Sequence, residues 1–126
     1  MQIMHTKDND KAIEFMRKNG AGEEQVDLSE SSFWCVAVVD NEVVGVAGVN
    51  IGKYADRIKG FFVAKEMRNK GIGTALLQDA MKYTKAGRVT AYCTRNSEGI
   101  FTRYGFKVTR EPNRYGISFT EWRRES

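Results

Sequence analysis

The sequence predicts an α/β fold in which helices flank one mixed sheet. Short apolar runs of strand length recur along the chain, and two segments instead repeat their apolar residues with the period of a helix. No repeat, linker or low-complexity tract separates these elements. With 126 residues and 41% hydrophobic content, the chain is long enough for one core, and we expect residues 1–126 to form a single domain.

The amino-terminal elements are expected to be a strand and a helix. Residues 2–5 form the strand, and the helix after it can be capped by the polar residues 8–10 and closed by Gly20. The acidic and polar segment 21–32 has few apolar residues, and we expect it to be a loop.

A hairpin is expected next, with apolar strands at 33–39 and 42–51 around a tight turn. Gly45 and Gly48 in the second strand indicate a bulge or a close approach by another part of the chain. The remaining elements follow in order: a strand at 57–63, a helix at 74–86 with Gly87 as its left-handed cap, a strand at 88–93, a short helix at 97–104, and strands at 106–109 and 115–122.

The charge of the chain is mildly basic, with 20 Lys and Arg residues against 16 Asp and Glu residues and a formal net charge of +4. A polyanionic small ligand or a nucleic-acid backbone would each account for it. No run of five or six like charges occurs, and the arginines of the carboxyl-terminal third are scattered over faces that we expect to be solvated. We therefore expect no nucleic-acid partner.

Three residue types that often mark sites carry little signal here. Cys35 and Cys93 are far apart and lack a CxxC pattern, which favours free buried thiols in a reducing cytoplasm. His5 has no second type of ligand near it in the sequence, so we expect neither a metal site nor a histidine-dependent triad. The longest apolar runs, such as residues 33–39, are too short to cross a bilayer, which predicts a soluble, cytoplasmic protein.

The most informative stretch is the loop between the strand at 57–63 and the helix after it. The first amides of a helix have no internal partner, and the helix dipole places partial positive charge there. Pyrophosphate binds well at such a point, and glycines let its oxygens approach the backbone. The predicted loop consists of Arg68, Asn69, Lys70, Gly71, Ile72, Gly73 and Thr74, in which two cations and one hydroxyl supplement the amides.

Two other phosphate-binding loops fit this stretch poorly. The dinucleotide fingerprint requires a third glycine at position 76, where the chain has Leu76, and the Gly-Lys-Ser/Thr sequence of a P-loop is absent. The remaining alternative is that Gly71 and Gly73 only allow a tight start of the helix.

The loop resembles the acetyl-coenzyme A signature of the GNAT superfamily of N-acetyltransferases, which reads Arg/Gln-x-x-Gly-x-Gly/Ala. The positions that match are Val63, Arg68, Gly71 and Gly73, with the helix start 74–77. Asn96 and the segment 104–106, Tyr-Gly-Phe, are similar to a later motif of that family, where a short helix leads into a Gly-Phe strand start. The expected order of elements also agrees with the family over nearly the whole chain.

This resemblance implies a GNAT-like fold, in which the mostly antiparallel sheet contains one parallel strand pair that splays apart. The strands 57–63 and 88–93 would part at their carboxyl ends, and the pantetheine arm of acetyl-coenzyme A would pair there with strand backbone. The positions implied to contact this co-substrate are Phe61, Phe62, Val63, Arg68, Asn69, Lys70, Gly71, Ile72, Gly73, Thr74, Asn96 and Phe101. No metal is expected.

A catalytic base is less clearly marked. Because an alkyl amine keeps its proton up to a pKa of about 10.4, acetyl transfer needs a base or a water chain. The strand 57–63 carries no acid, and Asp56 at its start is the nearest carboxylate. Glu42, Glu24 and Asp27 are further candidates, although each of these acids could simply be a solvated surface charge.

The resemblance also implies that a tyrosine on the short helix protonates the leaving thiolate. Phe101 occupies the aligned position, and it cannot donate a proton. Tyr104 on the same helix and Tyr92 on the neighbouring strand could take this role, although an aromatic residue before Gly-Phe is more often part of a core. A thiol with a pKa of about 8.5 leaves tolerably without help, at a loss in rate on the order of 10² to 10⁴.

The predicted function is direct acetyl transfer from acetyl-coenzyme A to a primary amine of a small molecule or a protein. Phe101 favours the alternative of a coenzyme A-binding sensor or interaction module that catalyses weakly or not at all. We expect no membrane partner, and either a monomer or a homodimer paired through the edge of the final strand.

Overall fold

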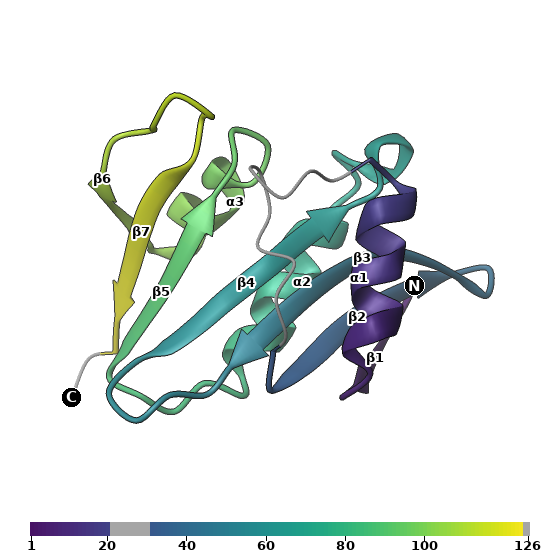
Figure 1. The fold of residues 1–126 in the computed structure, drawn as a ribbon, viewed down its shortest axis with the longest axis horizontal. Helices are drawn as coiled ribbons and strands as arrows, with labels where there is room; N and C mark the ends of the chain where they lie inside the picture. Colours follow the sequence, from purple (N-terminus) through teal and green to yellow (C-terminus); the bar gives the residue numbers. More distant parts are fainter. Residues whose placement is uncertain (21–30, 125–126) are drawn as a thin grey trace.

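A computed structural model describes residues 1–20 and 31–124, whose strands form one seven-stranded sheet. Its elements are β1 (Gln2–Thr6), α1 (Asn9–Lys18), β2 (Phe33–Val39), β3 (Glu42–Asn50), β4 (Asp56–Val63), the 3-10 helix η1 (Lys65–Met67), α2 (Ile72–Met81), β5 (Arg88–Cys93), α3 (Glu98–Tyr104), β6 (Lys107–Arg110) and β7 (Ser118–Arg123). The strand order is β1-β2-β3-β4-β5-β7-β6, with β4 and β5 parallel and the other pairs antiparallel (Figure 1). The predicted mixed sheet is confirmed; most of the loop expected at 21–32 lies outside the described residues.

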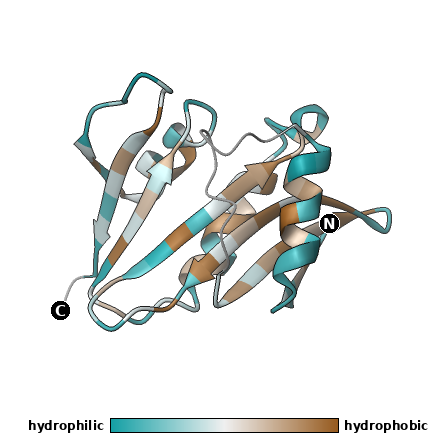
Figure 2. Ribbon diagram, viewed as in Figure 1, coloured by the Kyte–Doolittle hydropathy of each residue, from teal (hydrophilic) through white to brown (hydrophobic). Residues whose placement is uncertain are grey.

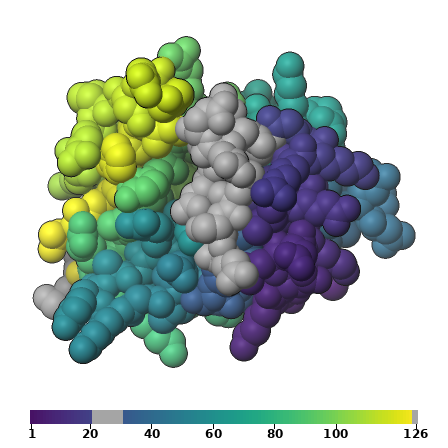
Figure 3. All heavy atoms as spheres, in the orientation of Figure 1, coloured from purple at the N-terminus to yellow at the C-terminus, as the bar shows by residue number. Residues whose placement is uncertain are grey.

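Helices cover both faces of this sheet. α1 lies on one face, and α2 and α3 lie on the other (Figure 1). Successive residues of β2 point to opposite faces, so Trp34 packs with Met16 of α1 while Cys35 joins the core around Leu76 of α2. On the face seen in Figure 3, α1 (purple) lies at the right and the carboxyl-terminal strands (yellow) lie at the left.

The hydropathy of the elements follows this arrangement. The central strands carry the most hydrophobic stretches, whereas β6 and the loop after it are largely hydrophilic (Figure 2). None of the helices in the described ranges combines the length and the apolar character needed to span a bilayer. Within the described ranges, the core residues lie between the sheet and the helices on its two faces.

The parallel strand pair is short. β4 and β5 pair only between residues 56–58 and 89–91, although both strands continue beyond these positions. On its other side β4 stays paired with β3 as far as Val63, across an irregularity next to Gly60, whose φ is 63°. The carboxyl half of β4 thus has a strand partner on one side only, which confirms the predicted splay.

α2 differs from its predicted range at both ends, since it begins at Ile72 and ends at Met81. The amides at 85–86 donate to the carboxylate of Asp56 instead of to helix carbonyls, and this contact turns the chain away from the helix axis. The prediction that Gly87 forms a left-handed cap is wrong, because its φ is not positive.

The final strand also differs from its prediction. β7 starts at Ser118 and not at Tyr115, because the side chain of Asn113 accepts hydrogen bonds from the amides of Tyr115 and Ile117 and holds them in a turn. β7 is paired with β5 on one side and with β6 on the other, so the expected pairing of this strand with a second subunit is wrong. The outer strands of the described sheet are β1 and β6.

The close approach predicted at two glycines of β3 is confirmed. A Cβ added at Gly45 would lie 2.9 Å from Leu76 Cδ1. A Cβ added at Gly48 would lie 2.7 Å from the Lys59 carbonyl oxygen and 2.5 Å from Ser31 Oγ. Since the carbonyl of Lys59 is part of the neighbouring strand, it cannot move aside without disturbing the sheet.

Replacing Gly48 by Ala should therefore lower the free energy of unfolding by about 1–3 kcal/mol, the usual effect of overpacking. Urea denaturation followed by far-ultraviolet circular dichroism measures this change. Gly87→Ala is the matched control, because an added Cβ there meets nothing within 4 Å, and it should change stability by less than about 0.5 kcal/mol. Equal stabilities of the two variants would contradict the tight contact at Gly48.

Candidate functional site

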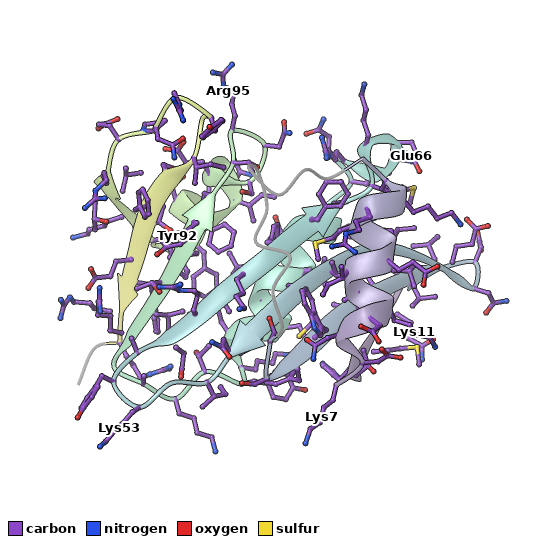
Figure 4. The ribbon with its side chains drawn as sticks, viewed as in Figure 1. Lys7, Lys11, Lys53, Glu66, Tyr92 and Arg95 are labelled. Atoms are coloured by element: carbon purple, nitrogen blue, oxygen red, sulfur yellow. The ribbon has the colours of Figure 1, made fainter. Side chains whose placement is uncertain are left out.

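A cavity of about 630 Å³ opens where β4 and β5 part. Its walls come from the end of β4, the loop before α2, the turn into α3, and the loop between β6 and β7. The lining residues are Phe61, Phe62, Val63, Arg68, Asn69, Gly71, Gly73, Thr74, Thr94, Arg95, Asn96, Ser97, Gly99, Ile100, Arg103, Arg114, Tyr115 and Gly116. Figure 4 shows Arg95 and Glu66 at this same end of the sheet, extending from the turn after β5 and from η1.

The loop before α2 exposes the start of the helix to the cavity. Asn69 and Gly71 both have a left-handed backbone, with φ of 64° and 82°, and α2 begins at the next residue. The amide of Ala75 donates to the carbonyl of Gly71 at 3.1 Å. The amides of residues 72–74 precede this first helical bond and have no partner within the helix, so they form an anion-binding start.

The two glycines of this loop are needed for different reasons. At Gly71 an added Cβ would meet nothing within 4 Å, so the residue is required only by its backbone conformation. At Gly73 an added Cβ would lie 2.6 Å from Ile100 Cδ1 of α3, so this glycine lets α2 and α3 approach each other. The alternative interpretation, that the glycines only allow a tight start of the helix, thus explains Gly73 in part. Gly71 is exposed, and a side chain there meets no other residue, so a substitution at Gly71 is the better test of whether an anion binds at the helix start.

Arg68 connects this loop to the end of β4. Its Nε donates to the carbonyl oxygen of Val63 at 3.0 Å, and its guanidinium carbon lies 5.3 Å from the centre of the Phe62 ring. These contacts hold the guanidinium at the mouth of the cavity. Two other predicted loop residues do not line the cavity: Lys70 is exposed and Ile72 is buried under the helix.

Three further arginines line the cavity, and sequence reasoning did not assign them to it. They are Arg95 after β5, Arg103 on α3 and Arg114 in the β6–β7 loop. No Asp or Glu is among the described residues that line the cavity, so four arginines line it without a lining carboxylate. Such a surface attracts a polyanion.

The structure does not bring the aromatic candidates Phe101, Tyr104 and Tyr92 to the cavity lining. Phe101 is 1% exposed and forms edge contacts with Phe61 and Phe106, each with ring centres 5.0 Å apart. Phe101 thus supports the wall of the cavity through its contact with Phe61. The ring centre of Tyr104 lies 6.1 Å from the ring centres of both Phe106 and Trp122, on the side of α3 that faces β7.

Tyr92 lies on the opposite face of the sheet from α2 and α3. Its ring contacts Phe119 at 4.6 Å between centres, and the guanidinium of Arg57 lies 4.6 Å from its centre. Tyr115 is the one tyrosine among the described lining residues. Sequence reasoning missed Tyr115 because it placed this residue in the last strand; the Asn113 and Gly116 beside it were the available signal for a turn.

Asp56 lies at the opposite end of β4 from the cavity, where β4 and β5 are still paired. Its carboxylate accepts hydrogen bonds from the amides of Lys85 at 2.7 Å, Ala86 at 2.9 Å and Gly52 at 3.1 Å. Burial alone would raise the pKa of Asp56, but these three amides and the charge of Arg124 outweigh it and hold the pKa below its usual value.

These contacts favour a structural role for Asp56 over the role of a base. The other acids considered as bases do not change this picture. Glu42 is exposed at the β2–β3 turn and does not line the cavity, and Glu24 and Asp27 lie outside the described residues. The cavity lining combines four arginines with a small set of hydroxyl and amide side chains, among them Thr94, Asn96 and Ser97.

The sequence matches the family model of the acetyltransferase (GNAT) domain over residues 4–126. It is also similar to a Xenopus tropicalis protein named "Probable N-acetyltransferase camello", with 29% identity over 109 residues. That alignment covers 79% of this chain and 50% of the relative, so the chain spans about half the length of this curated protein.

Solved structures resemble the fold at low sequence identity. Escherichia coli ElaA has a TM-score of 0.74 at 13% identity, with 99% of this chain and 100% of that chain covered. A GNAT family acetyltransferase from Elizabethkingia anophelis, solved with acetyl-coenzyme A bound, has a TM-score of 0.58 at 20% identity and covers 73% of this chain and 76% of its own. At these identities the likeness establishes the fold.

Proposed function

The chain belongs to the GNAT acetyltransferase family, and on that premise we propose that it moves an acetyl group from acetyl-coenzyme A to a primary amine of a small molecule or a protein. The observation that carries this proposal is the cavity between the parted strands. It joins an open helix start to four arginines and has no lining carboxylate. A ligand with several phosphate groups and an amide-rich arm fits this combination.

The residues of the cavity would divide the work of holding acetyl-coenzyme A. The amides at 72–74 and Arg68 suit the pyrophosphate, and the three arginines beyond the loop suit the remaining phosphate charge. The segment 61–63 has no strand partner on the β5 side, so its backbone can pair with the amides of the pantetheine arm. Asn96 lies across the cavity and can hydrogen-bond to the same arm.

Acetyl-coenzyme A would supply an activated acetyl thioester. In the transfer, a C–N bond forms between the amine and the acetyl carbon, the C–S bond breaks, and the amine loses one proton while the thiolate gains one. The described lining holds no carboxylate to accept the proton, so we propose that ordered water carries it out of the cavity. Alignment of the two reactants then supplies most of the rate enhancement.

Tyr115 is the proposed proton donor to the leaving thiolate, because it lines the cavity and the adjacent turn holds its backbone. Tyr115→Phe should lower kcat about 100-fold with a smaller change in KM, since general-acid help typically contributes that much. Tyr92→Phe and Tyr104→Phe are the matched controls and should leave kcat nearly unchanged. If Tyr115→Phe keeps full kcat, the thiolate leaves without help from this hydroxyl.

Thiol release from acetyl-coenzyme A in the presence of a panel of amines tests the transferase proposal itself. Release that depends on one class of amine, with the acetylated product identified by mass spectrometry, would support it. Tight binding of acetyl-coenzyme A with no release for any amine would instead favour the non-catalytic binding module, for which the aligned Phe101 is the motivating observation. Two buried free thiols, Cys35 and Cys93, fit the proposal that the protein works in the reducing cytoplasm.

A further inference from the structure

Outside the cavity, the fold brings together three side chains that bind metals in other proteins. His5 on β1 is paired in register with Cys35 on β2, and Asp79 reaches both from α2. His5 Nε2 lies 2.6 Å from Asp79 Oδ2, and the ligand atoms of the three residues all lie within 4.8 Å of one another. Sequence reasoning expected no metal because no second type of ligand clusters near His5 in the sequence, and Cys35 and Asp79 are far from it along the chain.

The three groups span the boundary between core and solvent. Cys35 is fully buried, the Asp79 side chain is 16% exposed, and the His5 side chain is 38% exposed. An ion can therefore reach the imidazole from solvent, while the thiol supplies a ligand from within. The ring of Tyr83 contacts the His5 ring with centres 5.0 Å apart and restricts its orientation.

The cluster is hydrogen-bonded when no ion is present. His5 Nε2 donates to Asp79 Oδ2, and burial together with this nearby carboxylate raises the pKa of the Cys35 thiol. A thiol coordinates a metal as the thiolate, so an ion that binds these three side chains must displace the proton of Cys35.

We propose that His5, Cys35 and Asp79 bind one divalent transition-metal ion of the zinc class. One imidazole nitrogen, one thiolate and one carboxylate oxygen form a donor set suited to Zn²⁺, with water in a fourth position, whereas Mg²⁺ and Ca²⁺ prefer oxygen ligands. Bonds of about 2.0–2.3 Å to a tetrahedral ion place its ligand atoms about 3.5 Å apart. Separations of up to 4.8 Å can reach that geometry by small side-chain rotations.

Binding is balanced by the loss of one proton. The metal–sulfur bond replaces the S–H bond of Cys35, whose proton leaves to solvent. His5 Nε2 gives up the proton that it donates to Asp79, and the ring takes one from solvent on Nδ1, so the imidazole binds through Nε2 as the neutral tautomer. Asp79 binds as the carboxylate. The ion would join the outer strand β1 to β2 and to α2. Since it binds the folded chain only, it would raise the midpoint of thermal unfolding.

Titration of the purified, reduced chain with CoCl₂ tests this site without acetyl-coenzyme A or any activity measurement. We expect a thiolate-to-cobalt charge-transfer band that saturates at one ion per chain and disappears when ZnCl₂ displaces the cobalt. Cys35→Ser should abolish the band, and His5→Gln should weaken binding by at least about 100-fold, since loss of even an outer partner of a metal ligand costs up to that factor.

Cys93→Ser is the matched control, because Cys93 is also a buried free thiol but contacts Thr120 and not the cluster. It should keep the band and the affinity. No charge-transfer band in the wild type, or an unchanged band in Cys35→Ser, would overturn the proposal. If Cys35→Ser fails to fold, His5→Gln decides instead: His5 is partly exposed, and unchanged cobalt affinity in that variant would also overturn the proposal.

Discussion

Replacing Gly71 by Asp should weaken the binding of acetyl-coenzyme A by about a thousandfold. At a protein surface, the repulsion between a carboxylate and a phosphate about 4 Å away costs about 4 kcal/mol of binding free energy. Gly71 is exposed at the start of α2, and an added side chain there meets nothing within 4 Å. Its φ of 82° suits Asp and Asn better than other residues that carry a side chain. The carboxylate would stand where the proposed pyrophosphate is held.

Gly71→Asn is the matched control, since it has the same shape and the same backbone preference without the charge. Isothermal titration calorimetry of the wild type and both variants gives the three dissociation constants. Asp and Asn are both good residues before a helix, and a negative charge there stabilises α2, so unfolding would not explain a loss of binding in the Asp variant alone. Equal affinities of the Asp and Asn variants would show that the phosphates lie elsewhere.

The contrast between this loop and the rest of the cavity shows what sequence patterns can reveal. The signal at 68–74 is local: a strand end, two glycines, cations and a helix start follow one another directly. The other arginines of the cavity come from three separate segments of the chain: the turn after β5, the helix α3 and the β6–β7 loop. Arg103 and Arg114 meet the loop only because β5 pairs with β7 and α3 packs beside α2. No periodicity in the chain encodes that meeting.

Contacts between residues that are far apart in the sequence account for the other features that the sequence did not predict. His5 and Asp79 are 74 positions apart, and only the placement of α2 behind β1 and β2 joins them. The early end of α2 has a similar origin, because residue 85 donates to Asp56, which stands 29 positions away. Helical period and propensity favoured continuing the helix through this point, and a tertiary hydrogen bond prevailed.

Asp56 also determines where the sheet stays closed. It begins β4 at the only part of that strand that pairs with β5, and its carboxylate holds the loop before β4 and the chain between α2 and β5. The fork that forms the cavity therefore has its closed end at this residue. Removing a carboxylate that is 1% exposed and bonded to three amides leaves partly buried donors without partners.

Replacing Asp56 by Ala should lower the free energy of unfolding by about 3–5 kcal/mol, and replacing it by Asn by about 1–3 kcal/mol. Guanidinium denaturation of both variants measures this, with Asp40→Asn at the exposed β2–β3 turn as control, expected within about 0.5 kcal/mol of wild type. Because Asp56 would be structural, folded Asp56→Asn should keep most of its kcat. A stable variant with a large loss of kcat would instead restore Asp56 as a base.

The pH dependence of stability provides a second test of the same group. The pKa of Asp56 is lowered in the folded protein, so at pH values near and below its unfolded pKa the folded state holds fewer protons than the unfolded state. Its contribution is complete above the unfolded pKa of about 3.9 and is lost as the pH falls through the lower, folded pKa. The stability difference between wild type and Asp56→Asn should therefore be constant above about pH 5 and shrink below about pH 4. A difference that stays constant down to pH values well below this range would mean that the ionised carboxylate does not hold the closed end of the fork.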